Sequence, residues 1–477
     1  MRNRLIPIIL LVTLAAGVFF SRVLSLPNLQ AKGPDSYYTQ WGSTQYDALH
    51  YDLDLNVSVD TNFLSGIVTI EAIAKEDLTE FALDLRGLTV AEVLVNNQPA
   101  TFRQADAKLW ITPPLKLSAS EPFTSRITYS GNPQPFISDS DPNVAVGWIK
   151  YQDGIVVLDE PDGASSWFPS NNHPSDKATY TLHVTTPKQY NVFGNGVLTD
   201  QVNHGTETTY TWQMDKPMAS YLVCINISTY SDKTDNVNGI PLRFYAKSAS
   251  VDTVDIQLAY AKDMIPYFSQ FFGPYPFSTY GGVVIDVDSA PTEEIKGDWE
   301  SLYGLETQSF TLFFKNNDVD LAAHELAHQW FGNDVSLTDW HDIWLKEGFA
   351  KFSEWLWEEH LNGAQSLRDK LFAPDAYDKF VTEYEAYPPG NPPRNNLYHA
   401  TVYLRGAMTL YALRLKLGDD TFFHIVRTFV DQYSYSNAST KDFIKVAEEV
   451  SNQDLSAFFD TWLYSTHLPK RTELGLP

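Results

Sequence analysis

The sequence predicts a multidomain protein, with an N-terminal antiparallel β-sandwich-like domain followed by a mostly α-helical domain. Three observations carry this prediction. The chain has 477 residues, which is more than one ordinary hydrophobic core organises. Apolar residues alternate with a period of two up to about residue 248, and they recur with helical spacing beyond it. Hydrophobic residues make up 43% of the chain and aromatic residues 14%, so a disordered protein is excluded.

The first domain is predicted to span residues 36–248. Its clearest strand lies at residues 51–59, where polar positions separate five apolar ones that share a face: Tyr51, Leu53, Leu55, Val57 and Val59. Similar runs occur at residues 67–74, 91–95, 180–184, 208–212 and 242–245. Turn-forming residues such as Asn96-Asn97 separate them, as expected for a sheet built from short antiparallel strands.

The second domain is predicted to span residues 249–477 and to be mixed at its start. A strand is expected at residues 282–287, followed by a loop through Pro291. Helical periodicity predicts helices at residues 251–271, 318–331, 343–361, 399–417, 421–433 and 440–450. The proline-rich stretch at residues 388–393 is expected to be a loop, because proline breaks helix interiors.

Residues 1–25 are predicted to form a signal peptide or a membrane anchor. Arg2 and Arg4 precede an apolar run at residues 5–20, the pattern of a secretory signal peptide. The cleavage pattern near Ser25 is loose, so a membrane anchor formed by residues 5–20 is the alternative. The positive charge before the apolar run favours a cytoplasmic N-terminus, so the body is expected to be extracytoplasmic, either secreted or anchored at the cell surface.

Charge and cysteine content exclude further classes. There are 34 basic and 59 acidic residues, a formal net charge of −25, which repels phosphate backbones and argues against a nucleic-acid partner. Cys224 is the single cysteine, which rules out an intramolecular disulfide and a thiolate metal cluster. Its neighbours are apolar, so a buried, unreactive thiol is expected.

The most informative segment for function is His324-Glu325-Leu326-Ala327-His328. Asp318 or Asp320 is a candidate N-cap and Gly332 lies just past the expected helix end. Residues i and i+4 share a helix face, so His324 and His328 can bind one metal ion, and Glu325 can reach a water beside it as a general base.

A hydrolytic zinc site needs a third protein ligand and one open position. Glu347, 18 residues after His328, is the favoured candidate, and His341 is its rival. As a lone histidine before a helix, His341 is more readily explained by a structural role. One Zn²⁺ per chain is therefore expected, held by His324, His328 and Glu347.

The sequence resembles the aminopeptidase N (alanyl aminopeptidase) family of gluzincin zinc peptidases. The similarity is carried by residues 324–333 (HELAHQWFGN) and 344–350 (WLKEGFA). It extends to Glu160-Pro161, to residues 167–169, 174–178 and 217–222, and to a last match at residues 458–463. The resemblance implies a thermolysin-like catalytic domain and a hydrolase that removes N-terminal residues from peptides with a free N-terminus.

The resemblance also implies roles that spacing alone does not show. Tyr403, in Val402-Tyr403-Leu404-Arg405-Gly406, matches the tyrosine that stabilises the oxyanion. Glu300 matches the glutamate of the exopeptidase motif, with Gly297 at its start, and is expected to bind the substrate ammonium. Trp299 takes the place of a slimmer residue in the first specificity pocket.

Three departures from the family pattern keep other functions open. Only Gly297 and Glu300 match the exopeptidase motif, Asp298 adds a second carboxylate, and Leu158 stands where a glutamine usually meets the amine. The match ends near residue 463, so a short form without the family's C-terminal helical domain is expected. The alternatives are a zinc oligopeptide endopeptidase or other amide hydrolase, and an inactive peptide-binding protein.

Overall fold

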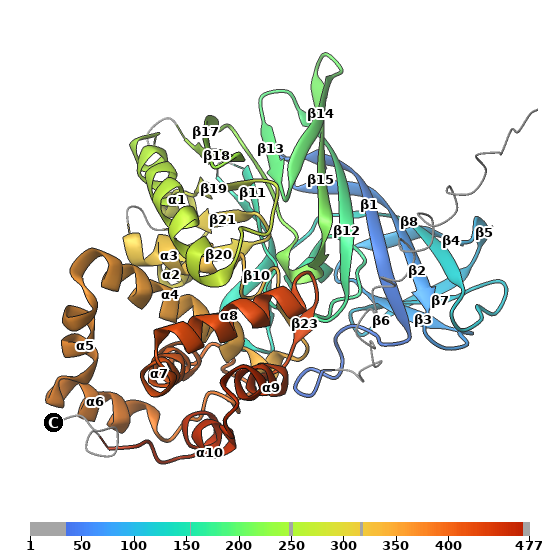
Figure 1. Cartoon of the computed structure of the whole chain (residues 1–477). Helices are drawn as coiled ribbons and strands as arrows, with labels where there is room; N and C mark the ends of the chain where they lie inside the picture. Colours follow the sequence, from blue (N-terminus) through green and yellow to red (C-terminus); the bar gives the residue numbers. More distant parts are fainter. Residues whose placement is uncertain (1–34, 153, 248–250, 315–317, 471–477) are drawn as a thin grey trace, which may run out of the picture. The chain divides into compact units, whose positions relative to one another are not determined.

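The computed structural model describes residues 35–152, 154–247, 251–314 and 318–470 (Figure 1). It confirms the predicted fold class, a β-rich N-terminal part followed by a mixed and then mostly helical part. The predicted signal or anchor in residues 1–25 lies outside the described residues and stays a prediction. Among the helices of the described residues, none is both long and apolar enough to cross a membrane.

The largest sheet has eight strands, and its central strand β1 confirms the predicted alternation. Tyr51, Leu53, Leu55 and Val57 of β1 are buried, whereas Asp54 and the other residues between them are partly or fully exposed. In sheet order the strands are β14 (Val197–Asn203), β15 (Glu207–Ala219), β12 (Lys177–Pro187), β1 (Tyr46–Ser58), β2 (Phe63–Ala74), β8 (Pro122–Gly131), β4 (Thr89–Val95) and β5 (Gln98–Pro99).

Two smaller sheets complete the β-rich part. One runs β13 (Asn191–Gly194), β16 (Ile225–Ser228), β11 (Gly154–Leu158), β10 (Asp141–Tyr151) and β9 (Phe136–Ser138). The other runs β3 (Phe81–Asp84), β7 (Lys108–Thr112) and β6 (Thr101–Ala105). Strand β11 is buried along its whole length and leads directly to Glu160, so it delivers that carboxylate from the β-rich part.

A further five-stranded sheet crosses the predicted domain boundary at residue 248. Its order is β17 (Ser231–Val237), β18 (Ile240–Ala246), β19 (Tyr280–Val284), β21 (Phe310–Phe313) and β20 (Gly304–Thr307). Strand β18 pairs in parallel with β19, so β17 and β18 hydrogen-bond into the second part of the chain. Helix α1 (Val251–Phe272) joins β18 to β19, as a parallel pair requires.

The remaining helices follow the predicted ones, with three longer additions and the four-residue α10 (Ser456–Phe459). The predicted set includes α3 (Val319–Ala327), α4 (Trp344–Asn362), α7 (Ala400–Leu417), α8 (Asp419–Tyr433) and α9 (Thr440–Ser451). Helices α2 (Glu293–Leu302), α5 (Ala364–Phe372) and α6 (Pro374–Tyr384) were not predicted, and neither were β20 and β21. Four further short elements lie in this part of the chain: β22 (Ser336–Leu337), β23 (Asn437–Ala438), α10 and a π-helical turn at Asp460–Tyr464.

Candidate metal centre and active site

Helix α3 presents the two histidines. Asp318 caps it, because its side chain accepts the backbone N–H groups of Asp320 and Leu321. The helix ends at Ala327, earlier than predicted, because the N–H groups of Gln329 and Trp330 bond to carbonyls only three residues back. His328 keeps right-handed helical backbone angles, so its ring still lies one turn along from that of His324, with ring centroids 4.9 Å apart.

Glu347 of α4 completes a group of three potential metal ligands. Its Oε2 lies 3.3 Å from His324 Nε2 and 3.5 Å from His328 Nε2. One donor atom from each residue lies within 4.8 Å of the others. Donor atoms held about 2.0–2.2 Å from a tetrahedral zinc ion are about 3.3–3.6 Å apart. The donor set and its spacing therefore fit one zinc ion.

Both histidines are held in the orientation that leaves Nε2 for a metal. His324 Nδ1 lies 2.8 Å from Glu354 Oε1, and His328 Nδ1 lies 3.0 Å from the carbonyl oxygen of Phe331. Such partners fix the ring and its tautomer at metal sites. Burial lowers the pKa of His324, but its hydrogen bonds to Glu347 and Glu354 outweigh burial and raise that pKa to about 10.

Glu325 is buried beside the three potential ligands. Its Oε2 has no hydrogen-bond partner among the described residues. Burial raises its pKa to about 8, an effect that Glu306 and Glu347 reinforce and His324 opposes. A Cβ at Gly304, the first residue of β20, would lie 2.7 Å from Glu325 Oε1. The side chain of Glu325 therefore has room only because residue 304 is glycine.

A buried lysine links the metal centre to two further carboxylates. Lys346 Nζ lies 2.9 Å from Glu347 Oε1 and 2.6 Å from Glu160 Oε1, and it contacts Glu306. Lys346 is fully buried, and the side chains of Glu160 and Glu306 are each 4% exposed. Glu306 Oε1 also lies 3.9 Å from His328 Nδ1. Burial raises the pKa of Glu160 well above its usual value, and the charge of Glu306 adds to this.

Tyr403 of α7 faces the histidines. Its ring stacks on that of His324, with centroids 6.0 Å apart and planes 24° apart. Burial, followed by the charge of Glu347, raises the pKa of Tyr403 well above its usual value, so the hydroxyl keeps its proton. Helix α7 is fixed by Arg405, whose guanidinium donates to five backbone carbonyls, those of Tyr384, Glu385, Thr461, Trp462 and Ser465.

The structure does not bring the predicted exopeptidase motif to this cluster. Gly297, Trp299 and Glu300 all lie on α2. The side chain of Glu300 is exposed, and Glu300 belongs to none of the potential metal-ligating groups found among the described residues. Trp299 is completely buried, and its ring packs against those of Tyr151 and Phe314. Glu306, six residues after Glu300, places its carboxylate near His328 instead.

The other residues weighed from the sequence have structural partners. His341 Nδ1 lies 2.8 Å from Asp339 Oδ1, and His341 is absent from the metal-ligating groups of the described residues. Asp298 Oδ2 accepts the backbone N–H of Ala145 at 3.2 Å. Leu158 is buried in β11, two residues before Glu160.

Sequence reasoning missed the roles of Glu160, Glu306, Lys346, Glu354 and Tyr398. The hydroxyl of Tyr398 is buried without a hydrogen-bond partner among the described residues, and burial, followed by the charge of Glu160, raises its pKa well above the usual value. Glu306 follows Gly304-Leu305, and nothing in that stretch shows which groups its carboxylate meets. Lys346 and Glu354 flank Glu347 on α4, but nothing in their spacing shows which partners they meet.

Comparison with known proteins shows the origin of this arrangement. Residues 257–462 match the peptidase family M1 domain, and residues 47–222 match the peptidase M1 N-terminal domain. Glutamyl aminopeptidase of Sus scrofa is 28% identical over 339 residues, which cover 67% of this chain and 35% of that protein. Aminopeptidase N of Lactococcus lactis subsp. lactis is 25% identical over 443 residues, which cover 88% of this chain and 51% of that protein. The chain thus spans about a third to a half of these relatives.

Solved structures match over nearly their whole length. An M1 zinc metallopeptidase from Deinococcus radiodurans superposes with a TM-score of 0.81 at 29% identity, covering 91% of this chain and 97% of that one. A variant of it bound to a Tyr-Ser-Ala substrate gives a TM-score of 0.80 at 28% identity, covering 91% and 98%. A β-rich part followed by a helical part with an HExxH helix and a downstream glutamate defines a gluzincin-type protein. Within that class, the chain belongs to peptidase family M1.

Proposed function

We propose that this chain is a zinc-dependent aminopeptidase that hydrolyses the first peptide bond of substrates with a free N-terminus. One observation carries the proposal, the charge balance of the buried site. Three buried carboxylates, those of Glu160, Glu306 and Glu347, contact Lys346, and the charge of Lys346 also acts on a fourth, that of Glu325. Without a metal, burial favours the protonated forms of Glu160 and Glu325, and a bound divalent cation would reverse that preference. With all four carboxylates ionised, Lys346 and a divalent zinc ion leave one negative charge uncompensated. A single α-ammonium group supplies the missing positive charge, and buried charges require such pairing.

The proposal assigns amine recognition to Glu160 and Glu306 in place of Glu300. Both carboxylates are buried and adjoin the metal ligands, so an amine held there would place the first carbonyl within reach of the metal. Contacts between an ammonium group and a carboxylate are charge-assisted hydrogen bonds, which are about twice as strong as neutral ones. An endopeptidase would leave this negative charge unpaired, which disfavours the endopeptidase alternative.

In the proposed mechanism, His324, His328 and Glu347 hold the zinc ion. Bound there, zinc would supply Lewis acidity to the scissile carbonyl and to the attacking water. Glu325, which ligates no metal in this scheme, accepts the proton of that water and passes it to the leaving amine. Tyr403 donates its hydroxyl proton in a hydrogen bond to the carbonyl oxygen as negative charge develops there.

The names of the similar proteins support the same function. Several relatives are glutamyl aminopeptidases, another is an aminopeptidase N, and a structural neighbour was solved with a tripeptide substrate. The inactive peptide-binding alternative is disfavoured because the potential ligands, the base and the tyrosine all meet in one cluster.

Hydrolysis of a fluorogenic aminoacyl amide, followed with zinc content, tests the proposal. Wild-type protein should lose activity to a chelator and regain it with added zinc. Glu325→Gln should retain zinc and lose turnover, because only the proton acceptor is removed. A zinc-loaded wild-type protein that hydrolyses none of a broad panel of aminoacyl amides would overturn the proposed function.

We also propose an extracytoplasmic location, resting on the charge and hydropathy of residues 1–25 alone. Fractionation of producing cells, with N-terminal sequencing of the product, would distinguish a cleaved, secreted form from one anchored by residues 5–20. Recovery of the full-length chain in the cytoplasm would contradict the location.

A further inference from the structure

We infer that residues 35–38, the first described residues of the chain, form a positioning element of the active site. These residues, called here the N-terminal clamp, are Asp35, Ser36, Tyr37 and Tyr38. The inference rests on the proposed function and adds a role for a segment that lies about 290 residues before the metal-binding helix. The clamp touches three parts of the molecule, each of which leads to a different active-site side chain.

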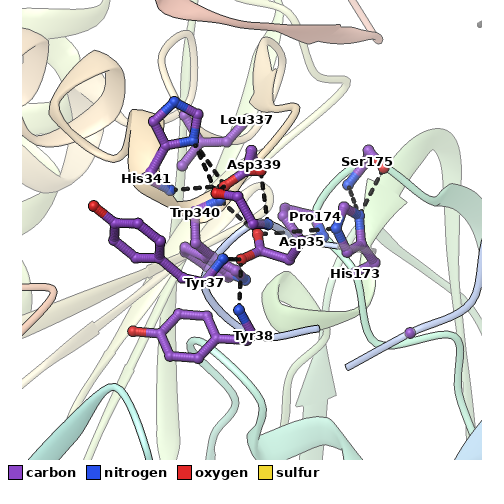
Figure 2. A network of polar contacts seen from close by, with 12 residues as sticks. Asp35, Tyr37, Tyr38, His173, Pro174, Ser175, Leu337, Asp339, Trp340 and His341 are labelled. Atoms are coloured by element: carbon purple, nitrogen blue, oxygen red, sulfur yellow. Dashed lines mark hydrogen bonds and ion pairs between the residues drawn. The ribbon is translucent and has the colours of Figure 1, made fainter. Parts of the chain in front are cut away.

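The first contact fixes the turn before α4. The Asp35 carboxylate accepts the backbone N–H of Trp340 at 2.7 Å, in addition to those of Tyr37 and Tyr38 (Figure 2). Asp339 accepts both the backbone N–H and the hydroxyl of Ser36 at 2.9 Å. Helix α4 begins four residues after Trp340 and carries Glu347 in its first turn. The clamp therefore fixes the start of the helix that bears the third metal ligand.

The second contact fixes the loop before α7. The Tyr37 hydroxyl donates to the carbonyl oxygen of Pro392 at 2.8 Å, and the Tyr38 hydroxyl donates to that of Arg394 at 2.5 Å. Tyr38 is fully buried and its ring stacks on Trp41, with centroids 4.0 Å apart. The loop continues into α7, which carries Tyr403. The two hydroxyls thus bond to the segment that positions the proposed oxyanion donor.

The third contact reaches the β-rich part of the chain. Asp35 Oδ2 lies 3.9 Å from His173 Nε2, and Figure 2 shows both side chains in one network with Asp339 and His341. Just after the clamp, Gly42 packs so closely that a Cβ there would lie 2.7 Å from His173 Cβ. His173 lies 13 residues after Glu160, whose carboxylate is proposed to bind the amine, so the contact holds the loop that follows Glu160. All three contacts meet at the clamp.

The arrangement matters because the three parts are far apart in sequence. A substrate can contact Glu347, Tyr403 and Glu160 together only if the two helices and the loop that carry them keep fixed relative positions. A misplacement of about 1 Å in an active site can cost about 100-fold in rate.

The test removes hydroxyl groups and keeps the rings. In Tyr37→Phe/Tyr38→Phe, the ring stacked on Trp41 remains while the bonds to the loop before α7 are lost. Tyr46→Phe is the matched control, because its hydroxyl also donates to a buried carbonyl, that of Ala82 at 2.9 Å, within the β-rich part. Asp35→Asn is a second probe, since it removes the charge that holds the turn before α4. Each variant is measured for zinc content, thermal midpoint, kcat and KM.

If the clamp positions the active site, kcat should fall about 10-fold or more in the double variant and in Asp35→Asn. The reference is Tyr46→Phe, and the proteins are compared at equal zinc content. In the zinc-free Tyr37→Phe/Tyr38→Phe protein, backbone amides of residues 388–399 should exchange hydrogen faster than in zinc-free Tyr46→Phe. Activity within twofold of Tyr46→Phe, or unchanged exchange in that loop, would overturn the inference. If the wild type itself hydrolyses no aminoacyl amide, the proposed function fails, and the exchange measurement still decides whether the clamp holds the loop.

Discussion

Gly348 of α4 and Gly406 of α7 lie so close together that a Cβ at either position would press on the backbone of the other helix. A Cβ at Gly348 would lie 3.0 Å from the Cα and from the carbonyl carbon of Gly406, and a Cβ at Gly406 would lie 3.0 Å from the Cα of Gly348. Glu347 directly precedes one glycine, and Tyr403 lies one turn before the other. The close crossing of the two helices therefore sets the separation of a proposed metal ligand and the proposed oxyanion donor.

Substituting either glycine should impair catalysis more than folding. Gly348→Ala or Gly406→Ala must push the helices apart, at an overpacking cost of about 1–3 kcal/mol. The higher helix propensity of alanine, about 1 kcal/mol, offsets part of this cost. We expect kcat to fall at least tenfold, with a small change in the free energy of unfolding measured by denaturant titration.

Gly297→Ala is the control for the helix crossing, because Gly297 is helical and exposed and a Cβ there would meet no atom within 4 Å. It should leave kcat unchanged and stabilise the fold slightly. If all three alanine variants kept wild-type kcat, the helix crossing would have no part in setting the active site.

Glu306 should be needed for substrates with a free amine, and Glu300 should not. Glu306→Gln keeps the shape of the side chain and removes the charge that faces the ammonium, a contact worth about 1.5–3 kcal/mol. We expect kcat/KM for free aminoacyl amides to fall about 10–150-fold. The exposed Glu300→Gln should stay within twofold of wild type. The reverse order of effects would restore Glu300 as the amine-binding residue, and zinc content should be checked in both variants.

Tyr403→Phe should keep the fold and lose rate. The ring that stacks on His324 remains, while the hydroxyl that is proposed to stabilise the oxyanion is removed. Loss of one such donor costs about 10²–10³-fold in kcat. Steady-state kinetics should show the loss in kcat with little change in KM. A variant within a few-fold of wild type would make Tyr403 a structural residue.

Cys224 should be unreactive in the folded protein. Its side chain is fully buried, and burial raises the pKa of the thiol to about 12. Because the reactive form is the thiolate, a raised pKa means that the thiol stays protonated at pH 8 and reacts only after unfolding. A colorimetric thiol reagent at pH 8 should therefore label no cysteine in native protein and one per chain in denaturant. Rapid labelling of the native protein would show that the segment around Cys224 opens.

The sequence was most informative where one local pattern determines the structure. The alternation along residues 51–59 specifies which side chains of β1 are buried, because a strand places every second residue on the same face. The four-residue spacing of His324 and His328 works in the same way on α3. Glu347 is favoured over His341 because a lone histidine before a helix is more readily explained by a structural role.

Amine recognition could not be predicted because it depends on long-range contacts. Gly297 and Glu300 match the spacing of the family motif, yet α2 places Trp299 in the core and Glu300 at the surface. Glu306 reaches the metal ligands only because β20 pairs with β21 at the edge of the five-stranded sheet. Its partner Glu160 arrives from the β-rich part, and no spacing in the sequence brings the two together.

The central claim is that buried carboxylates beside the zinc ligands select a free N-terminus. Comparing the hydrolysis of free and N-acetylated aminoacyl amides tests it most directly. Acetylation removes the charge that Glu160 and Glu306 would pair with and adds bulk where the amine should lie. We predict that zinc-loaded wild-type protein cleaves the free substrate and that kcat/KM for the acetylated one is lower by at least 100-fold, since more than one charge-assisted contact of about 1.5–3 kcal/mol is lost. Comparable cleavage of the two substrates would contradict the account and would favour an endopeptidase.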